Sequence, residues 1–168
     1  MSTPTRSVTD RWAWIRATLD VDEGMRLKAY RDKFGKISIG RGHNLEANPV
    51  PGIPAELGTV ITLDQALRLA EHDLQKAVSE VYSRVPFAVD LAPARFDVLV
   101  MMAFNMGITG LLGFKKMLAA LAAGDFAEAA RQMLASKWAL QLGDGEGGKD
   151  DRPERLANIM RTGEYPAA

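Results

Sequence analysis

Several residue types are missing or scarce in this chain of 168 residues, and each absence excludes a class of protein. Cysteine is absent, which excludes a disulfide scaffold, a thiolate metal site and a cysteine nucleophile. The two histidines, His43 and His72, are too few for a metal centre built from histidine, although a mixed site with carboxylates stays open.

An excess of one charge and a long hydrophobic run are missing as well. Lys plus Arg and Asp plus Glu both number 21, so nothing in the overall charge indicates a nucleic-acid partner. No apolar run approaches the roughly 20 residues that span a bilayer, which argues against membrane insertion. Residues 1–10 contain one arginine and no apolar signal-peptide core. We therefore expect synthesis in the cytoplasm.

The N-terminal part predicts a small mixed lobe. Thr9 or Asp10 can cap a helix that Gly24 ends. Residues 28–44 contain short β-prone pieces between glycines, which favours a hairpin or meander, and the proline-rich segment 48–58 is typical of a loop. We expect this lobe to cover about residues 10–61.

The rest of the chain predicts helices. The capping-box pattern Thr62-x-x-Gln65 opens a long helix that Pro86 stops. Four further helices are expected, at 93–106, 109–123, 125–138 and 153–162, with a glycine- and acid-rich loop at 143–151. The fold class is therefore α+β and mainly α, in a single domain: an N-terminal lobe, a connecting helix at 62–85 and a helical C-terminal lobe at 86–168.

Two carboxylates stand out between residues 23 and 44. Glu23 lies at the expected helix end, and Asp32 lies in the glycine-punctuated segment. A pair of acids across a cleft is what cleavage of a glycosidic bond requires. Spacing alone is a weak signal, because a solvated turn with surface salt bridges produces the same pattern. Residues 23–43 also contain six Lys/Arg and two acids, which suits an anionic polymer or a solvated face.

The longer pattern E-G-x-R-L-K-x-Y-x-D-x-x-G-x-x-[ST]-x-G-x-G-H, here residues 23–43, closely resembles the phage-type lysozymes of glycoside hydrolase family 24. The segments 60–62, 104–107, 109–114, 128–138 and 161–163 continue the resemblance, so that it covers about residues 13–165. It implies a lysozyme-like fold and an enzyme that cleaves the β-1,4 bond between N-acetylmuramic acid and N-acetylglucosamine in peptidoglycan. No cofactor is implied.

The resemblance also implies roles for three residues of this segment. Glu23 matches the general acid of the family. Asp32 matches the second carboxylate, which activates water or stabilises the transition state. Ser38 stands where the family most often has threonine, and its hydroxyl can still hold a water between the carboxylates. The stereochemical outcome stays open, because carboxyl groups about 5–5.5 Å apart suggest retention and about 6.5–9.5 Å suggest inversion.

Five further residues match substrate-contacting positions. Phe104 matches an aromatic that lines the substrate site, although a core phenylalanine would fit the same apolar helix. Arg152 matches an arginine that approaches the general acid, and we interpret it as a positioning group, since a nearby cation would favour ionised glutamate. Asn44, Met117 and Gln132 stand at sugar-contact positions but depart from the residues expected there.

His43 is interpreted as structural rather than catalytic. We expect it to pair with Asp73 on the long helix and to tie the hairpin to that helix. His72 is expected at the surface. The loop 143–151 lacks the spaced ligands of a calcium-binding EF-hand, so a solvated loop beside Arg152 is favoured.

Two other functions remain open. A lytic transglycosylase needs only the acid, and Asp32 argues against it. A non-catalytic wall-binding module on the same scaffold is the other, because fold alone does not guarantee function. For the lysozyme we expect a monomer that acts on the bacterial cell wall after release from the host cytoplasm by a separate holin, although tail-associated and prophage roles are equally compatible.

Overall fold

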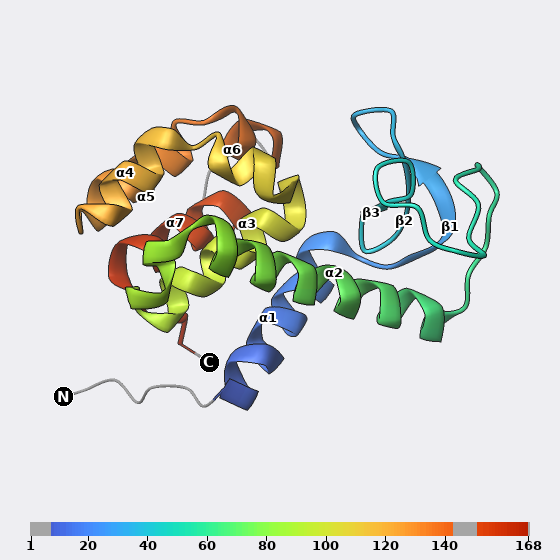
Figure 1. Ribbon diagram of the computed structural model, residues 1–168, viewed down its shortest axis with the longest axis horizontal. Coiled ribbons are helices and arrows are strands. Elements are labelled where there is room, and N and C mark those ends of the chain that lie inside the picture. The colour runs from blue at the N-terminus through green and yellow to red at the C-terminus, as the bar shows by residue number, and fades with distance from the viewer. Residues whose placement is uncertain (1–7, 143–150, 168) are drawn as a thin grey trace. The chain divides into compact units, whose positions relative to one another are not determined.

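The computed structural model describes residues 8–142 and 151–167 (Figure 1). Over these residues the chain forms seven α-helices, one short 3-10 helix and three strands, which confirms the predicted α+β, mainly α class. The chain divides into two compact units, Met1–Lys76 and Ala77–Ala168, and the division falls inside α2 (Leu63–Arg84).

Unit 1 begins with α1 (Val8–Glu23), the predicted N-terminal helix. The helix begins earlier than expected, so Thr9 and Asp10 lie in its first turn instead of capping it, a difference of one or two residues that is common at helix ends. Gly24 follows with φ +64°, a left-handed conformation that glycine adopts without steric cost. The helix therefore ends directly after Glu23.

The predicted hairpin or meander is a three-stranded antiparallel sheet in the order β1 (Arg26–Arg31), β2 (Ile37–Gly40) and β3 (His43–Asn44). All four residues of β2 are buried, as expected for a central strand. The segment 45–62 follows without regular strands or helices, which agrees with the expected loop.

A compact hydrophobic core joins the sheet to the start of α2. Ala66 and Leu69 of α2 belong to the same buried cluster as the sheet residues, which also includes Ala29, Ile37, Ile39, Leu45 and Ile61. Burying such a cluster contributes on the order of 25 cal/mol for each Å² of apolar surface removed from water. The sheet is therefore held in place by packing against α2.

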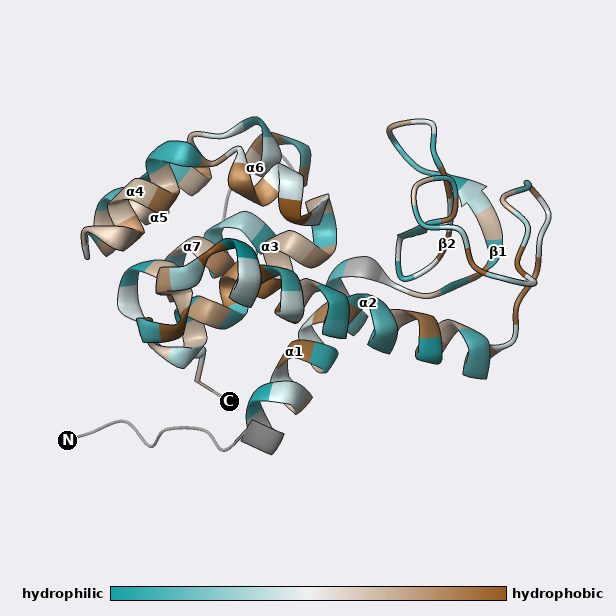
Figure 2. Cartoon of the chain, in the orientation of Figure 1, coloured by the Kyte–Doolittle hydropathy of each residue, from teal (hydrophilic) through white to brown (hydrophobic). Residues whose placement is uncertain are grey.

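The predicted capping box at the start of α2 is present. The Thr62 N–H donates to Gln65 Oε1 at 2.8 Å, and the Gln65 N–H donates to Thr62 Oγ1 at 3.1 Å. Figure 2 shows hydrophobic bands along an otherwise hydrophilic α2, as its apolar periodicity predicts. Pro86 lies just beyond its end, in the 3-10 helix η1 (Pro86–Asp90).

Unit 2 contains α3 (Pro93–Leu112), α4 (Lys115–Ala122), α5 (Phe126–Leu134), α6 (Lys137–Leu142) and α7 (Arg152–Thr162). The helix α5 packs against α4, α6 and α7, and α3 packs against α7. The first half of α3 is the most deeply buried segment, with Val98, Leu99 and Val100 fully inside.

Two predicted helices are each divided in the structure. The helix expected at 109–123 is interrupted after Leu112, because Phe114 has a non-helical ψ of 55° and two glycines precede it. The helix expected at 125–138 ends at Leu134, and α6 starts anew at Lys137. There Ser136 Oγ accepts the Ala139 N–H at 3.2 Å, which caps α6.

Two other expectations in this unit are confirmed. The predicted break at Gly107 is present as a kink inside α3, with φ 77° and ψ 162°. The final helix is confirmed at Arg152–Thr162. Of the predicted loop 143–151, residues 143–150 lie outside the described residues.

The helix α3 is longer than the sequence predicts, and its length and hydropathy approach those of a membrane span. Among the described residues it is the one helix long and apolar enough to cross a bilayer by length and composition, with a mean hydropathy of 1.4. Half of that window is buried inside the protein, as is equally typical of a core helix.

Candidate active site

Glu23 lies at the junction between α1 and the sheet. It is the last residue of α1, and Arg26, three positions later, opens β1 and pairs with Gly40 on β2. The positive φ of Gly24 makes the turn between helix and strand possible. The chain therefore brings the predicted general acid to the start of the strand that leads to Asp32.

Asp32 closes the β1–β2 hairpin with its carboxylate. Asp32 Oδ1 accepts the backbone N–H groups of Phe34 at 2.8 Å and Lys36 at 2.9 Å. The Asp32 carbonyl oxygen accepts the Gly35 N–H at 2.9 Å. Aspartate commonly forms such side-chain bonds to the turn that follows it. One carboxylate oxygen is thus fixed by the backbone.

Ser38 approaches the other carboxylate oxygen of Asp32. Its Oγ donates to Asp32 Oδ2 at 3.4 Å, a long hydrogen bond, and the residue is only 1% exposed. In the sheet Ser38 stands opposite both Tyr30 on β1 and Asn44 on β3. Directly opposite residues share one face, so three of the predicted site residues, Asp32, Ser38 and Asn44, lie together.

Asn44 also has a structural contact. Its Oδ1 accepts the backbone N–H groups of Glu46 and Ala47, both at 3.0 Å. This arrangement holds the turn after β3 in the same way that Asp32 holds the hairpin. The structure therefore shows a turn-forming role for Asn44 next to the predicted contact with substrate.

The predicted pairing of His43 with Asp73 is confirmed. His43 is buried, its Nδ1 lies 2.7 Å from Asp73 Oδ2, and its Nε2 lies 2.8 Å from the carbonyl oxygen of Asn48. Both partners only accept hydrogen bonds, so an imidazolium with two N–H groups satisfies both. The predicted surface position of His72 is also confirmed.

These contacts raise the pKa of His43. Burial is the largest single effect and lowers the pKa, but the hydrogen bond and charge of Asp73, with the Asn48 carbonyl, outweigh it. The pair joins β3 to α2 and therefore fastens the sheet that carries Asp32 and Ser38.

Sequence reasoning missed a second ion pair beside the site. Arg41, in the turn between β2 and β3, pairs with Asp20 in the last turn of α1. The Arg41 side chain is 11% exposed and that of Asp20 is 54% exposed, and burial lowers the pKa of Arg41. Opposite charges far apart in sequence carry no local signal, so only the structure reveals this link.

The other four predicted residues lie on four helices of unit 2. Phe104 is half-buried on α3, and Met117 on α4 is 1% exposed, so its burial favours packing over a direct sugar contact. Gln132 on α5 donates from Nε2 to Glu128 Oε1 at 2.6 Å. Arg152, the first residue of α7, is buried.

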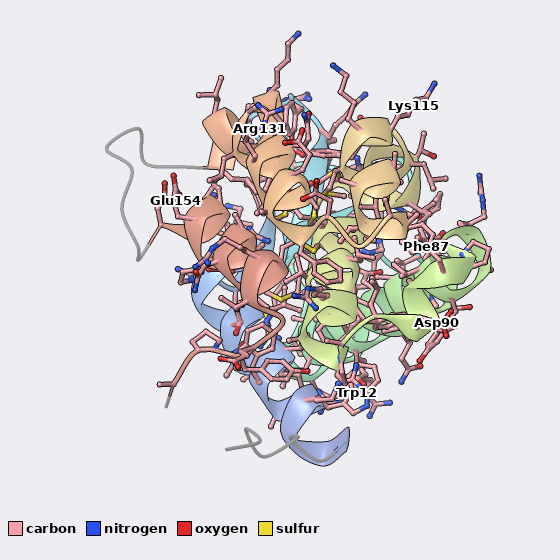
Figure 3. The ribbon with its side chains drawn as sticks, turned by 90° about the vertical axis from the view of Figure 1, so that its left-hand side faces the viewer. Trp12, Phe87, Asp90, Lys115, Arg131 and Glu154 are labelled. Atoms are coloured by element: carbon pink, nitrogen blue, oxygen red, sulfur yellow. The ribbon has the colours of Figure 1, made fainter. Side chains whose placement is uncertain are left out.

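Glu128 organises a small polar cluster on α5. Arg131 donates to both of its oxygens at 2.7 Å, and Figure 3 labels Arg131 at this surface. The hydrogen bond from Arg131, followed by that from Gln132, lowers the pKa of Glu128 to about 2. Gln132 is therefore held by a carboxylate that stays ionised at physiological pH.

A second contact that sequence reasoning missed lies next to Phe104. Trp138 Nε1 on α6 donates to Asn105 Oδ1 on α3 at 3.1 Å, and the Phe114 ring meets Trp138 edge-on at 6.2 Å. A buried indole N–H usually finds such a partner. The pair joins α6 to α3 at the residue next to Phe104. Asparagine followed by a distant tryptophan gives no pattern from which to predict it.

No group of three or more His, Asp or Glu side chains in the described part of the chain is placed to hold a metal ion.

A helix that ends on a glutamate, followed by a hairpin carrying an aspartate and a buried serine, defines a carboxylate-bearing lobe of the lysozyme type. The sequence matches the family described as Phage lysozyme over residues 21–152. This match covers more than half of the chain, and the chain therefore belongs to the phage lysozyme family. Membership confirms the predicted resemblance to the phage-type lysozymes.

The chain is also similar in sequence to several individual proteins. The chain is 32% identical over 160 residues to the pre-baseplate central spike protein Gp5 of Enterobacteria phage T4, covering 84% of the chain and 26% of that protein. It is 28% identical over 167 residues to the probable T4-type lysozyme 1 of Dictyostelium discoideum, covering 89% and 94%. It is 33% identical over 146 residues to the endolysin of Bacillus phage B103, covering 84% and 50%. The chain thus spans about a quarter of the spike protein and half of that endolysin.

Proposed function

We propose that this chain hydrolyses the β-1,4 bond between N-acetylmuramic acid and N-acetylglucosamine in peptidoglycan. The observation that carries the proposal is the hydrogen bond from Ser38 to Asp32 on the hairpin that follows Glu23. In a chain of this family, a carboxylate with one oxygen fixed and a hydroxyl beside the other is suited to directing a water.

The proposed mechanism divides the work between the two acids. Glu23 donates its proton to the glycosidic oxygen, which leaves with the electron pair of the broken bond as a sugar hydroxyl. The sugar carbon becomes oxocarbenium-like. In an inverting reaction, Asp32 and Ser38 orient the attacking water, and Asp32 accepts its proton. In a retaining reaction, Asp32 first bonds to the sugar carbon and water then displaces it, while Glu23 takes the proton back. The anomer first formed, read by proton NMR, distinguishes the two.

Substrate contacts are proposed on the same basis. Asn44 stands beside Ser38 in the sheet, which supports a contact near the reacting sugar. Phe104 and Gln132 are half-buried and have surface left for a sugar, and Arg152 is proposed to position the general acid. Of the five proposed substrate contacts, the one at Met117 has the least support, because its side chain is buried in this structure.

The proposal extends to the domain organisation, the oligomeric state and the place of action. We infer a single lysozyme domain with an N-terminal lobe at 10–61, a connecting helix at 62–85 and a C-terminal lobe at 86–168. It would act as a monomer on the bacterial cell wall, after synthesis in the host cytoplasm and release through a holin. The similarity to a phage spike protein keeps the tail-associated role open.

The first experiment compares the wild type with Glu23→Gln on outer-membrane-permeabilised bacteria, with turbidity and released sugars as readouts. General acid catalysis contributes about 10²–10⁴-fold, so the variant should lose activity by at least about a hundredfold. The matched control is Glu56→Gln, the same change at an exposed glutamate in the loop before α2, which should keep wild-type rates.

The products distinguish the proposed hydrolysis from a transglycosylase reaction and from wall binding without catalysis. New reducing ends that disappear with Glu23→Gln establish a hydrolase with Glu23 as its acid. Anhydro sugars would instead establish a transglycosylase. A wild type that sediments with cell walls without cleaving them would establish a binding module.

A further inference from the structure

Four large hydrophobic side chains are exposed within eleven residues of unit 1. They lie in the loop before α2 and on its first turns, with Leu57 54%, Val60 68%, Leu63 54% and Leu67 45% exposed. We call this set the 57–67 patch. Leu63 and Leu67 are four residues apart on a helix and therefore project from the same face. Large contiguous patches of exposed apolar side chains are uncommon on protein surfaces, and such patches often serve as interaction sites.

The 57–67 patch continues directly into β1. Lys28 and Val60 form an isolated antiparallel bridge, in which the Ala29 N–H donates to the Thr59 carbonyl at 2.8 Å and the Ile61 N–H donates to the Leu27 carbonyl at 2.9 Å. Residues opposite each other in such a bridge have neighbouring side chains on one face. The exposed Val60 therefore lies beside the exposed Lys28.

Cations are exposed along the hairpin to which this bridge joins the hydrophobic surface. The hairpin exposes five cations, which are Arg26, Lys28, Arg31, Lys33 and Lys36. Phe34, at the tip of the hairpin, is 62% exposed, and Lys33 Nζ lies 5.4 Å from the centroid of its ring. Of the acids nearby, Asp64 is paired with Arg68 at 2.9 Å. Residues 26–36 and 56–68 contain six cations and three carboxylates, a net charge of +3 in a chain whose overall charge is zero.

Two features of this surface indicate which kind of partner binds to it. Aliphatic side chains offer a sugar no hydrogen bond and no aromatic face, so the 57–67 patch does not suit a polysaccharide. Leucine and valine flanked by lysine and arginine do suit a bilayer, where hydrocarbon takes the aliphatic groups and lipid phosphates pair with the cations. Long cationic side chains can reach the headgroups while their stems stay apolar.

We propose that the 57–67 patch and the cations of the β1–β2 hairpin form a docking surface for an anionic phospholipid bilayer. Leu63, Leu67 and Val60 enter the boundary between headgroups and acyl chains, and Lys28 binds lipid phosphate beside them. Docking by side chains that enter only the boundary region is reversible. This property is separate from hydrolysis and holds whether or not the active site contains substrate.

The test is co-sedimentation of the full chain with sucrose-loaded vesicles at low salt. One set of vesicles is phosphatidylcholine alone, and the other contains phosphatidylglycerol in phosphatidylcholine. Each cation near an anionic surface contributes a factor of about five, so we expect at least about tenfold stronger partitioning onto the phosphatidylglycerol vesicles. Added salt should reverse the binding.

Two variants and their matched controls locate the surface. Leu63→Gln with Leu67→Gln should weaken partitioning by at least about tenfold, and so should Lys28→Glu. Leu140→Gln, at an 80% exposed leucine of α6, and Lys115→Glu, at an exposed lysine of α4 labelled in Figure 3, should not. Circular dichroism and hydrolysis of soluble wall fragments confirm that the patch variants still fold.

Three outcomes would overturn the proposal. The first is equal binding to both kinds of vesicle or to neither. The second is an equal loss in the Lys115→Glu control, which would indicate a general effect of charge. The third is a dimer in sedimentation velocity that Leu63→Gln with Leu67→Gln abolishes while vesicle binding stays unchanged, which would assign the patch to a second copy of this chain.

Discussion

At the scale of single residues, Asp32 combines a turn-forming role with the proposed catalytic one, and its two oxygens separate these roles. Asp32 Oδ1 accepts two backbone N–H groups of the hairpin, and Oδ2 meets Ser38. Asparagine keeps an oxygen that can accept the same N–H groups but lacks the negative charge, whereas alanine loses both.

We therefore predict different outcomes for the two substitutions of Asp32. Asp32→Asn should keep wild-type stability and lose activity by about a hundredfold or more. Asp32→Ala should lose activity and also about 1–2 kcal/mol of stability, because the hairpin loses its side-chain acceptor. Urea unfolding and turbidity assays measure the two effects. An active Asp32→Asn variant would reduce Asp32 to a turn residue.

His43 allows a prediction about pH. Its folded-state pKa is raised above the ordinary 6.5. The pairing with Asp73 therefore contributes its full stability below about pH 6.5, and this contribution is lost as the pH rises through the folded pKa. Asp73→Asn should cost about 2 kcal/mol at pH 5–6 and clearly less at pH 9.

Urea unfolding of the Asp73→Asn variant over this pH range tests the sign, with His72→Gln, at the exposed histidine, as the control that should change little. Activity of Asp73→Asn on soluble fragments should be spared where the variant is folded. A cost that grows with pH, or a matching loss of activity at full folding, would contradict the structural role of the pair.

At the scale of elements, the Asp20–Arg41 pair links the end of α1, where Glu23 lies, to the turn after β2. The two partners are unequally buried, so removing them should have unequal effects. Without Asp20 the mostly buried guanidinium loses its counter-charge, whereas without Arg41 the exposed Asp20 returns to water.

We predict that Asp20→Asn destabilises the protein by about 1–3 kcal/mol, and that Arg41→Met costs less than Asp20→Asn. The double variant should cost no more than Asp20→Asn alone, because the stranded cation is gone. Denaturant midpoints of the three variants measure this order. Equal costs for the two single variants would show that the pair is solvated and weak.

Local sequence signals predicted the elements well where a side chain itself makes the cap. Thr62 with Gln65 marks a helix start, and this cap is present through both side chains. The helix expected from residue 125 is also capped by a side chain, because Asp125 Oδ1 accepts the Glu128 N–H. The breaks before α4 and α6 were missed, because continuous apolar periodicity hides a short interruption. The second break depends on Ser136, whose hydroxyl starts a new helix in a position that is equally compatible with a helix interior.

The sequence predicts which residues form the candidate site better than it predicts how they are arranged. Residue types and the family resemblance named Asp32 and Ser38, and the pairing of His43 with Asp73 was also predicted. The row formed by Tyr30, Ser38 and Asn44 was not predicted, because it depends on strand register, and a shift of one residue would turn each side chain to the other face.

At the scale of the whole molecule, the distribution of charge matters more than its sum. The chain is neutral, yet residues 23–43 contain six cations and two acids. A local positive surface attracts a polyanion over about one Debye length, which is roughly 10 Å at 0.1 M salt and roughly 3 Å at 1 M. Attraction to an anionic cell wall should therefore be modest and short-ranged.

We predict that hydrolysis of intact cell walls slows several-fold as salt rises from about 0.05 M to about 0.5 M, through a higher KM with kcat unchanged. Lys28→Gln should weaken this salt dependence, and Lys115→Gln on α4, which removes the same charge outside the hairpin, should not. Uncharged N-acetylglucosamine oligomers are the control substrate, because their cleavage should not respond to salt. Rates on cell walls that stay flat with salt would show that the hairpin cations do not contribute to wall attraction and would leave bilayer docking as the role to test for them.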